Sequence, residues 1–128
     1  MIRLFKKDKH SIKLEFDISG AEELSEALQE VLNGREKILR VDEGIKKSLQ
    51  NSCNKVLKFE INNVQNNLTL LNDLITIEID KEEAEYGFER IKECIKGASF
   101  YPAEFCEINY NNKILTIYAL LIQEVISF

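Results

Sequence analysis

The chain has 128 residues, 45% of them hydrophobic and 30% charged, with a formal net charge of −5 at pH 7. This balance is typical of one folded domain spanning residues 1–128, and it excludes a disordered chain. The acidic charge also argues against nucleic acid as a partner, because binding to a phosphate backbone requires clustered Lys and Arg.

Two strands and a short loop are predicted at the start of the sequence. Residues 2–5 are apolar, and residues 12–18 alternate between apolar and charged side chains, as in a half-buried strand. Lys7–His10 lies between the two segments and predicts a hairpin loop. Residues 1–13 contain one acid, Asp8, and five basic residues: Arg3, Lys6, Lys7, Lys9 and Lys13. The rest of the chain is therefore more acidic than the net charge suggests.

The next segment predicts a helix. Ser19 and Glu22 have the spacing of a capping box, in which a hydroxyl residue is followed three positions later by Glu. An apolar stripe at helical spacing follows and stops at Gly34, so we expect the helix to run from Gly20 to Gly34. Residues 35–54 are less regular and predict a short strand at 38–41, then a helical turn containing Ile45 and Leu49.

Three strands and a second helix are predicted in the middle of the chain. Residues 57–61 alternate in polarity, and residues 68–71 and 74–79 flank a two-residue turn, Asn72–Asp73. The following helix begins after Asp80, which is its expected N-cap, and ends at Gly97.

A last hairpin is predicted near the C-terminus. Residues 105–110 and 114–122 flank Asn111–Asn112, a pair typical of tight turns. The final strand is apolar on both faces, which places it in the middle of a sheet or beneath a partner. At nine residues it is shorter than the ~20 of a membrane span. No leader segment is visible at the start of the sequence, so we expect a cytoplasmic protein with no membrane partner.

The order of these elements predicts the fold class. Hairpins dominate, so we expect an α+β fold with a mainly antiparallel sheet of about six to seven strands. The two main helices should pack on one face of this sheet.

Signatures of catalysis and metal binding are missing from the sequence. His10 is the only histidine, and Cys53, Cys94 and Cys106 lack the paired spacing of a zinc site or a redox pair. We expect the cysteines to be buried thiols in a reducing compartment. No glycine-rich phosphate-binding loop occurs. We therefore expect no enzymatic activity, no cofactor and no metal.

The first predicted helix is distinguished by its charge. It has no Lys or Arg between Gly20 and Gly34, and its four acids are Glu22, Glu23, Glu26 and Glu30. Three of them recur every four residues, although like charges at this spacing cost roughly 0.2–0.5 kcal/mol per pair. The row is either a solvated face or a docking surface for a basic protein. The second helix has a similar row, Glu82, Glu85, Glu89 and Glu93, which is diluted by Arg90, Lys92 and Lys96.

Three segments, taken with the size, charge and element order, resemble the small immunity proteins of bacterial contact-dependent inhibition and polymorphic toxin systems. They are Ile12–Phe16 in the opening hairpin, Ser19–Leu24 at the helix start and Ile117–Ile122 in the final strand. The resemblance implies an inert cytoplasmic protein that binds and neutralises one cognate toxin, which should be basic and nuclease-like. The predicted toxin-binding residues are Glu22, Glu23, Glu26, Glu30, Asp42 and Glu43.

Two other functions fit the sequence. The outer face of the final strand, with Tyr118, Leu120 and Ile122, would suit a homodimer. A pocket between sheet and helices, using Tyr101, Cys106 and Tyr110, would suit a small molecule.

Overall fold

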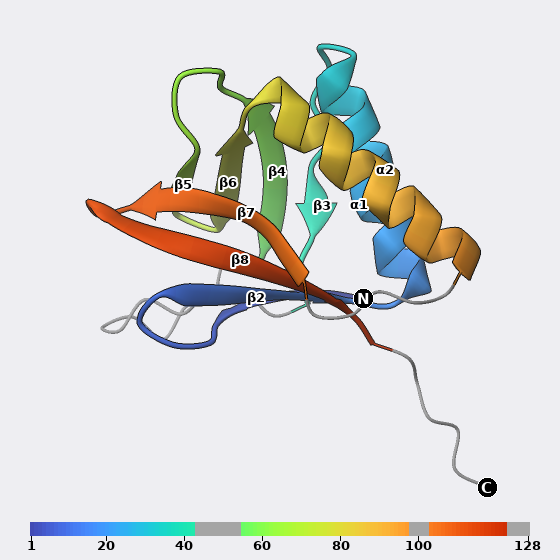
Figure 1. Cartoon of the computed structure of the whole chain (residues 1–128), viewed down its shortest axis with the longest axis horizontal. Coiled ribbons are helices and arrows are strands. Elements are labelled where there is room, and N and C mark those ends of the chain that lie inside the picture. The colour runs from blue at the N-terminus through green and yellow to red at the C-terminus, as the bar shows by residue number, and fades with distance from the viewer. Residues whose placement is uncertain (43–54, 98–102, 123–128) are drawn as a thin grey trace, which may run out of the picture.

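The computed structural model describes residues 1–42, 55–97 and 103–122. In these ranges eight strands form one sheet, and two helices pack beside each other on one face of it (Figure 1). The predicted α+β class is confirmed. The strands and helices are, in chain order, β1 Ile2–Lys6, β2 Ser11–Phe16, α1 Ile18–Leu32, β3 Leu39–Arg40, β4 Val56–Ile61, β5 Asn67–Leu71, β6 Leu74–Ile79, α2 Lys81–Gly97, β7 Ala103–Tyr110 and β8 Lys113–Leu121.

The sheet has more parallel pairing than the hairpins predict. Its strand order is β1-β2-β8-β7-β5-β6-β4-β3, with four antiparallel and three parallel neighbours. Parallel pairs arise because β8 inserts between β2 and β7, and β6 inserts between β4 and β5. β8 therefore lies centrally, as its two apolar faces predict. The eighth strand is β3, a two-residue edge strand in the segment expected to hold a short strand.

Two four-stranded halves meet at a narrow seam in the middle of the sheet. β1-β2-β8-β7 and β3-β4-β6-β5 each show the same series of antiparallel, parallel and antiparallel pairs. The halves join through β5 and β7, whose ladder consists of one residue pair, Asn67 with Asn109. Asn66 reinforces the seam, since its carbonyl accepts from the Asn109 N–H at 2.9 Å and its amide donates to the Glu107 carbonyl at 3.0 Å.

The first helix begins two residues before the predicted start. Its N-cap is Asp17 and not Ser19, because the Asp17 carboxylate accepts the Gly20 N–H at 2.7 Å and the terminal ammonium of Met1 at 2.8 Å. The predicted end is confirmed: the helix stops at Leu32, and Gly34 has a positive φ of 77° that suits glycine. At α2, the predicted cap Asp80 accepts the Glu83 N–H at 2.8 Å.

The core lies between the sheet and the two helices. It is formed by apolar residues that alternate along the strands and by the inner stripes of the helices, such as Leu24, Leu28 and Ile91. A β-bulge in β7 between Glu104 and Cys106 coincides with two consecutive buried residues, Phe105 and Cys106.

Candidate functional site

The four acids of α1 occupy its outer side, but the fold already pairs two of them. Glu22, Glu23 and Glu26 are exposed and Glu30 is half-buried. Lys37 Nζ lies 2.7 Å from Glu26 Oε1, and Arg35 Nε lies 2.7 Å from Glu30 Oε2. Two of the three members of the row Glu22–Glu26–Glu30, the α1 row, are therefore compensated by the segment after the helix. The sequence-based interpretation of an uncompensated row was wrong, because the helix alone does not show where the return segment runs.

The corresponding row on α2 is less compensated than the sequence suggests. Its four members, the α2 row, are all exposed: Glu82, Glu85, Glu89 and Glu93. Within the described ranges, their one ion pair joins Glu85 to Lys81 at 4.0 Å. Two of the bases that were expected to dilute the row lie over aromatic rings, where they keep their charge, and Lys92 forms no ion pair with the row among the described residues. Arg90 lies 5.4 Å from the Tyr86 ring centroid, and Lys92 lies 5.1 Å from that of Phe88.

Tyr86 adds an aromatic group to this surface. Its side chain is 63% exposed beside the α2 row, and Arg90 is held over it while donating to the Glu104 carbonyl at 3.1 Å. Tyrosine and arginine are the residue types that most often anchor protein interfaces. No sequence signal distinguished Tyr86 from a core aromatic at helical spacing.

The two rows belong to one surface. α1 and α2 pack against each other on the same side of the sheet, so their outer sides form a single layer, the helix layer (Figure 1). The two helices together carry nine carboxylates and four basic residues, and Arg35 and Lys37 from the following segment reduce this excess. The helix layer therefore keeps a net negative charge.

Asp42, a further predicted binding residue, forms hydrogen bonds within the fold. Its carboxylate accepts the Ile2 N–H at 2.9 Å, and its own N–H donates to the Ile2 carbonyl at 2.8 Å. These bonds attach the chain after β3 to the edge strand β1, so Asp42 has a structural role. Glu43 lies outside the described residues.

The residues predicted for a dimer face lie on the outer face of the sheet, whereas the described residues predicted for a small-molecule pocket lie in or against the core. Tyr118 and Leu120 of β8 are half-buried and face away from the core, and Ile122 follows the strand and is also half-buried, so the homodimer stays a prediction. Cys106 is buried in the core and Tyr110 packs against it, whereas Tyr101 lies outside the described residues. These three pocket residues line neither the cavity at the β1–β2 loop nor the one between the end of α1 and β4.

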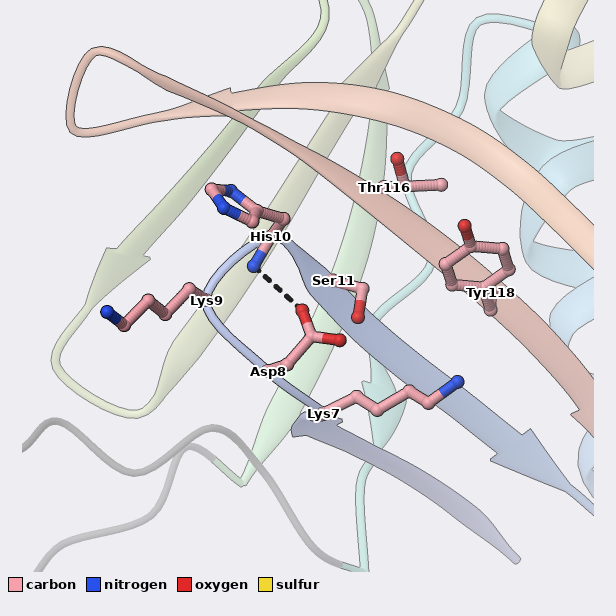
Figure 2. Close-up of a pocket in the computed structure, with 7 residues that line it drawn as sticks. All are labelled: Lys7, Asp8, Lys9, His10, Ser11, Thr116 and Tyr118. Atoms are coloured by element: carbon pink, nitrogen blue, oxygen red, sulfur yellow. Dashed lines mark hydrogen bonds between the residues drawn. The ribbon is translucent and has the colours of Figure 1, made fainter.

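The cavity at the β1–β2 loop lies at the opposite side of the molecule from the helix layer. It has a volume of about 480 Å³ and is bounded by the β1–β2 loop and by the outer face of β8 (Figure 2). Its loop residues are Lys7, Asp8, Lys9 and His10, and its strand residues are Ser11, Thr116 and Tyr118. The basic charge of residues 1–13 was the sequence signal for this site, but the contribution of β8 depends on a pairing that no local pattern reveals.

The cysteines and acidic residues form no site for metal binding within the described ranges. Cys94 and Cys106 are free and buried, as predicted, and burial raises the pKa of both thiols, whereas Cys53 lies outside the described residues. Among the described residues, no three His, Cys, Asp or Glu side chains form a group suited to a metal ion. Within those same ranges, no helix is long and apolar enough to cross a membrane.

Comparisons with known proteins assign neither a family nor a function. The sequence matches no protein-family model and no curated protein.

Proposed function

We propose that this protein is a non-catalytic binding module that neutralises a basic partner, as an immunity protein neutralises its cognate toxin. The observation that carries the proposal is the helix layer, where exposed glutamates of two adjacent helices take little part in holding the fold together. Glu22, Glu23 and three members of the α2 row have no ion pair among the described residues.

Electrostatic reasoning supports a protein partner for this surface. Like charges in a helical row are unfavourable by themselves, so a chain adapted only for stability would intersperse lysines. Complementary charge on a partner removes this repulsion and raises the association rate, which suits an inhibitor that must reach its target quickly. Tyr86 provides an apolar contact that charge alone cannot supply.

A nuclease-like toxin fits this surface because a site that binds nucleic acid is itself basic. An acidic module can cover such a site without imitating its substrate in detail. The competing interpretation, a solvated face with no partner, predicts that charge reversal on the helix layer has no effect on any interaction.

The direct test uses a toxin candidate encoded beside this chain, co-expressed with it in a growth assay. Three triple variants change the charge by the same amount. The first reverses Glu22, Glu23 and Glu26 to Lys, and the second reverses Glu82, Glu89 and Glu93. The third is the control and reverses Asp8, Asp73 and Glu107, which are exposed, lie in neither helix and form no ion pair among the described residues. Circular dichroism checks that each variant folds.

We expect the first two variants to lose protection and the control to keep it. Binding measured by calorimetry should weaken by at least tenfold for each helix variant, since several charge pairs are lost together. Full protection by both helix variants would refute the proposed surface. Loss of protection by the control to the same degree would show a general charge effect and would also refute it.

A further inference from the structure

We infer that the cavity between the β1–β2 loop and β8 binds a phosphate group, at a site separate from the helix layer. The inference does not depend on the proposed function. It starts from the charge of the hairpin, where residues 2–16 carry five basic side chains and two acids, Asp8 and Glu15, in a chain whose net charge is −5. A positive pole on an acidic protein attracts anions to that place and repels them from the rest of the surface.

The lysines at the cavity are available for an anion. Within the described ranges, neither Lys7 nor Lys9 has a carboxylate at ion-pair distance. Lys7 extends across the hairpin to β8, where its ammonium lies 5.4 Å from the Tyr118 ring centroid (Figure 2). This contact directs the ammonium along the cavity wall. In contrast, Lys13 is already paired with Glu15 at 3.2 Å and is not part of the lining.

Hydroxyl groups supply the neutral donors that a phosphate requires. Ser11, Thr116 and Tyr118 line the cavity from two strands, because the parallel register of β2 and β8 places Ser11 opposite Thr116. The Ser11 hydroxyl is buried beside Asp8 and helps to lower the pKa of that carboxyl, so it stabilises the loop, and the open donors are the other two hydroxyls. Thr116 and Tyr118 line the cavity with hydroxyls that make no side-chain hydrogen bond to other described residues.

Asp8 is the one carboxylate in the lining, and it shapes the loop. Its Oδ1 accepts the His10 N–H at 2.8 Å, and the N–H groups of Lys7 and Asp8 both donate to the Ser11 carbonyl. The His10 N–H, together with the nearby Ser11 hydroxyl, lowers the pKa of Asp8, so this carboxyl is ionised at neutral pH. A ligand anion is therefore attracted by the lysines and repelled by Asp8, which limits its affinity.

The size and the donors favour phosphate over a larger apolar ligand. A volume of about 480 Å³ is within the usual range for ligand sites, roughly 300–1,000 Å³. The described lining has few apolar side chains, and Lys7 is the ammonium that points toward the hydroxyl-bearing residues of β8 (Figure 2). Lys9 points away from them and contributes its charge at longer range, whereas charge-assisted hydrogen bonds from Lys7 would be the strong ones.

The test is a titration of the full-length protein with inorganic phosphate, followed by amide chemical shifts in two-dimensional NMR at low ionic strength. A parallel titration with adenosine monophosphate determines whether the group binds alone or as part of a larger molecule. We expect saturable shifts at residues 7–11 and 116–118 with either probe. Tighter binding of the nucleotide would mean that the natural ligand carries the phosphate on a larger molecule, and equal binding would mean a free anion.

Matched variants separate a built site from general attraction to a basic surface. Lys7→Ala should weaken binding about tenfold, whereas Lys92→Ala, which removes the same charge from α2, should have no effect. Tyr118→Phe leaves the charge unchanged and should weaken binding a few-fold through the lost hydroxyl. Asp8→Asn should strengthen binding because it removes the repulsion.

Two results would overturn the inference. One is the absence of saturable shifts with both probes. The other is an equal effect of Lys7→Ala and Lys92→Ala together with none for Tyr118→Phe, since diffuse attraction to lysines would then explain the binding.

Discussion

Helices α1 and α2 both expose a row of glutamates, yet the fold treats the two rows differently. Two members of the α1 row are paired with Arg35 and Lys37, which follow the helix in the chain. The α2 row has one long ion pair, and two neighbouring bases lie on aromatic rings. The sequence ranks α1 as the more unusual helix, but among the described residues the structure leaves three glutamates of the α2 row without an ion pair and only Glu22 of the α1 row. A row of like charges therefore identifies a functional surface only after its tertiary partners are known.

The largest expected effect concerns how closely each helix approaches its neighbours. A Cβ at Gly20 of α1 would overlap the backbone carbonyl of Met1, whereas a Cβ at Gly87 of α2 would lie 2.8 Å from the edge of the Phe105 ring. A ring can shift more easily than backbone, so we expect Gly20→Ala to destabilise by about 3 kcal/mol and Gly87→Ala by about 1–2 kcal/mol. Urea unfolding of both variants measures the difference.

Gly34→Ala is the control for this pair. Its Cβ would meet no atom within 4 Å, so only the positive φ is penalised, at about 1 kcal/mol. If Gly87→Ala lowered the free energy of unfolding more than Gly20→Ala, the assumption that backbone shifts less easily than an aromatic ring would be wrong.

The next effect concerns the attachment of α2 to the seam of the sheet. The Asn66 amide donates to Glu83 Oε2 at 2.7 Å, and its Oδ1 accepts the Asp80 N–H at 3.1 Å. Asn66→Ala removes these two bonds and the one to the Glu107 carbonyl, and it leaves a half-buried carboxylate without its donor, so we expect a loss of about 2–3 kcal/mol. Asn63→Ala removes one bond, from the Lys81 N–H, and should cost at most about 1 kcal/mol in the same unfolding experiment.

A smaller effect concerns the N-caps of α1 and α2, whose contributions to stability should depend differently on pH. Partial burial acts to raise the pKa of Asp17, but the terminal ammonium and the Gly20 N–H outweigh it, and the net pKa is lowered. A lowered pKa contributes stability above the unfolded-state pKa, and this stability is lost as the pH falls through the folded-state value. Asp17→Asn keeps a good cap but removes the charge, so it should cost about 1 kcal/mol near neutral pH and little below about pH 3.

Asp80→Asn is the matched change at α2, and its sign should differ. Burial raises the pKa of Glu83, and the charge of Asp80 adds to this shift. A raised carboxyl pKa means that ionisation opposes folding, and the penalty disappears as the pH falls through the raised value. Removing the Asp80 charge relieves this repulsion, so Asp80→Asn should be neutral or slightly stabilising near neutral pH. Equal destabilisation by Asp17→Asn and Asp80→Asn would show that the two caps do not differ in this way.

The smallest expected effect concerns the difference in ion pairing between the α1 row and the α2 row. Glu30→Gln should destabilise by about 0.5 kcal/mol through the lost pair with Arg35, whereas Glu89→Gln should change stability by less than that. A double-mutant cycle on Glu30 and Arg35 isolates the pair energy, and added salt should reduce it. A coupling energy of zero would remove the distinction between the two rows.

Local patterns predicted most of the strands and helices because their causes are local. Asn72 and the pair Asn111–Asn112 adopt positive φ at the predicted turns, as asparagine tolerates. The wrong N-cap at Ser19 has a long-range cause, since Asp17 is favoured by contact with Met1.

Long-range pairing explains what the sequence could not predict. No pattern indicated that β8 would insert between β2 and β7, or that Lys37 would reach Glu26. Among the candidate site residues, the exposure of Glu22, Glu23 and Glu26 followed from helical spacing, but the exposure of Tyr86 and the cavity beneath the hairpin loop depended on tertiary packing.

The central position of β8 has a consequence for the order in which the chain folds during synthesis. β4, β5 and β6 are contiguous in the chain, so three strands of one half can assemble as soon as they leave the ribosome. β2 pairs with β8 across roughly 100 residues of sequence, because Ser11 lies opposite Thr116. The β1–β2 hairpin must therefore wait with an open edge until the last strand is translated. This interval is when the nascent protein is most exposed to wrong strand pairing and most in need of a chaperone.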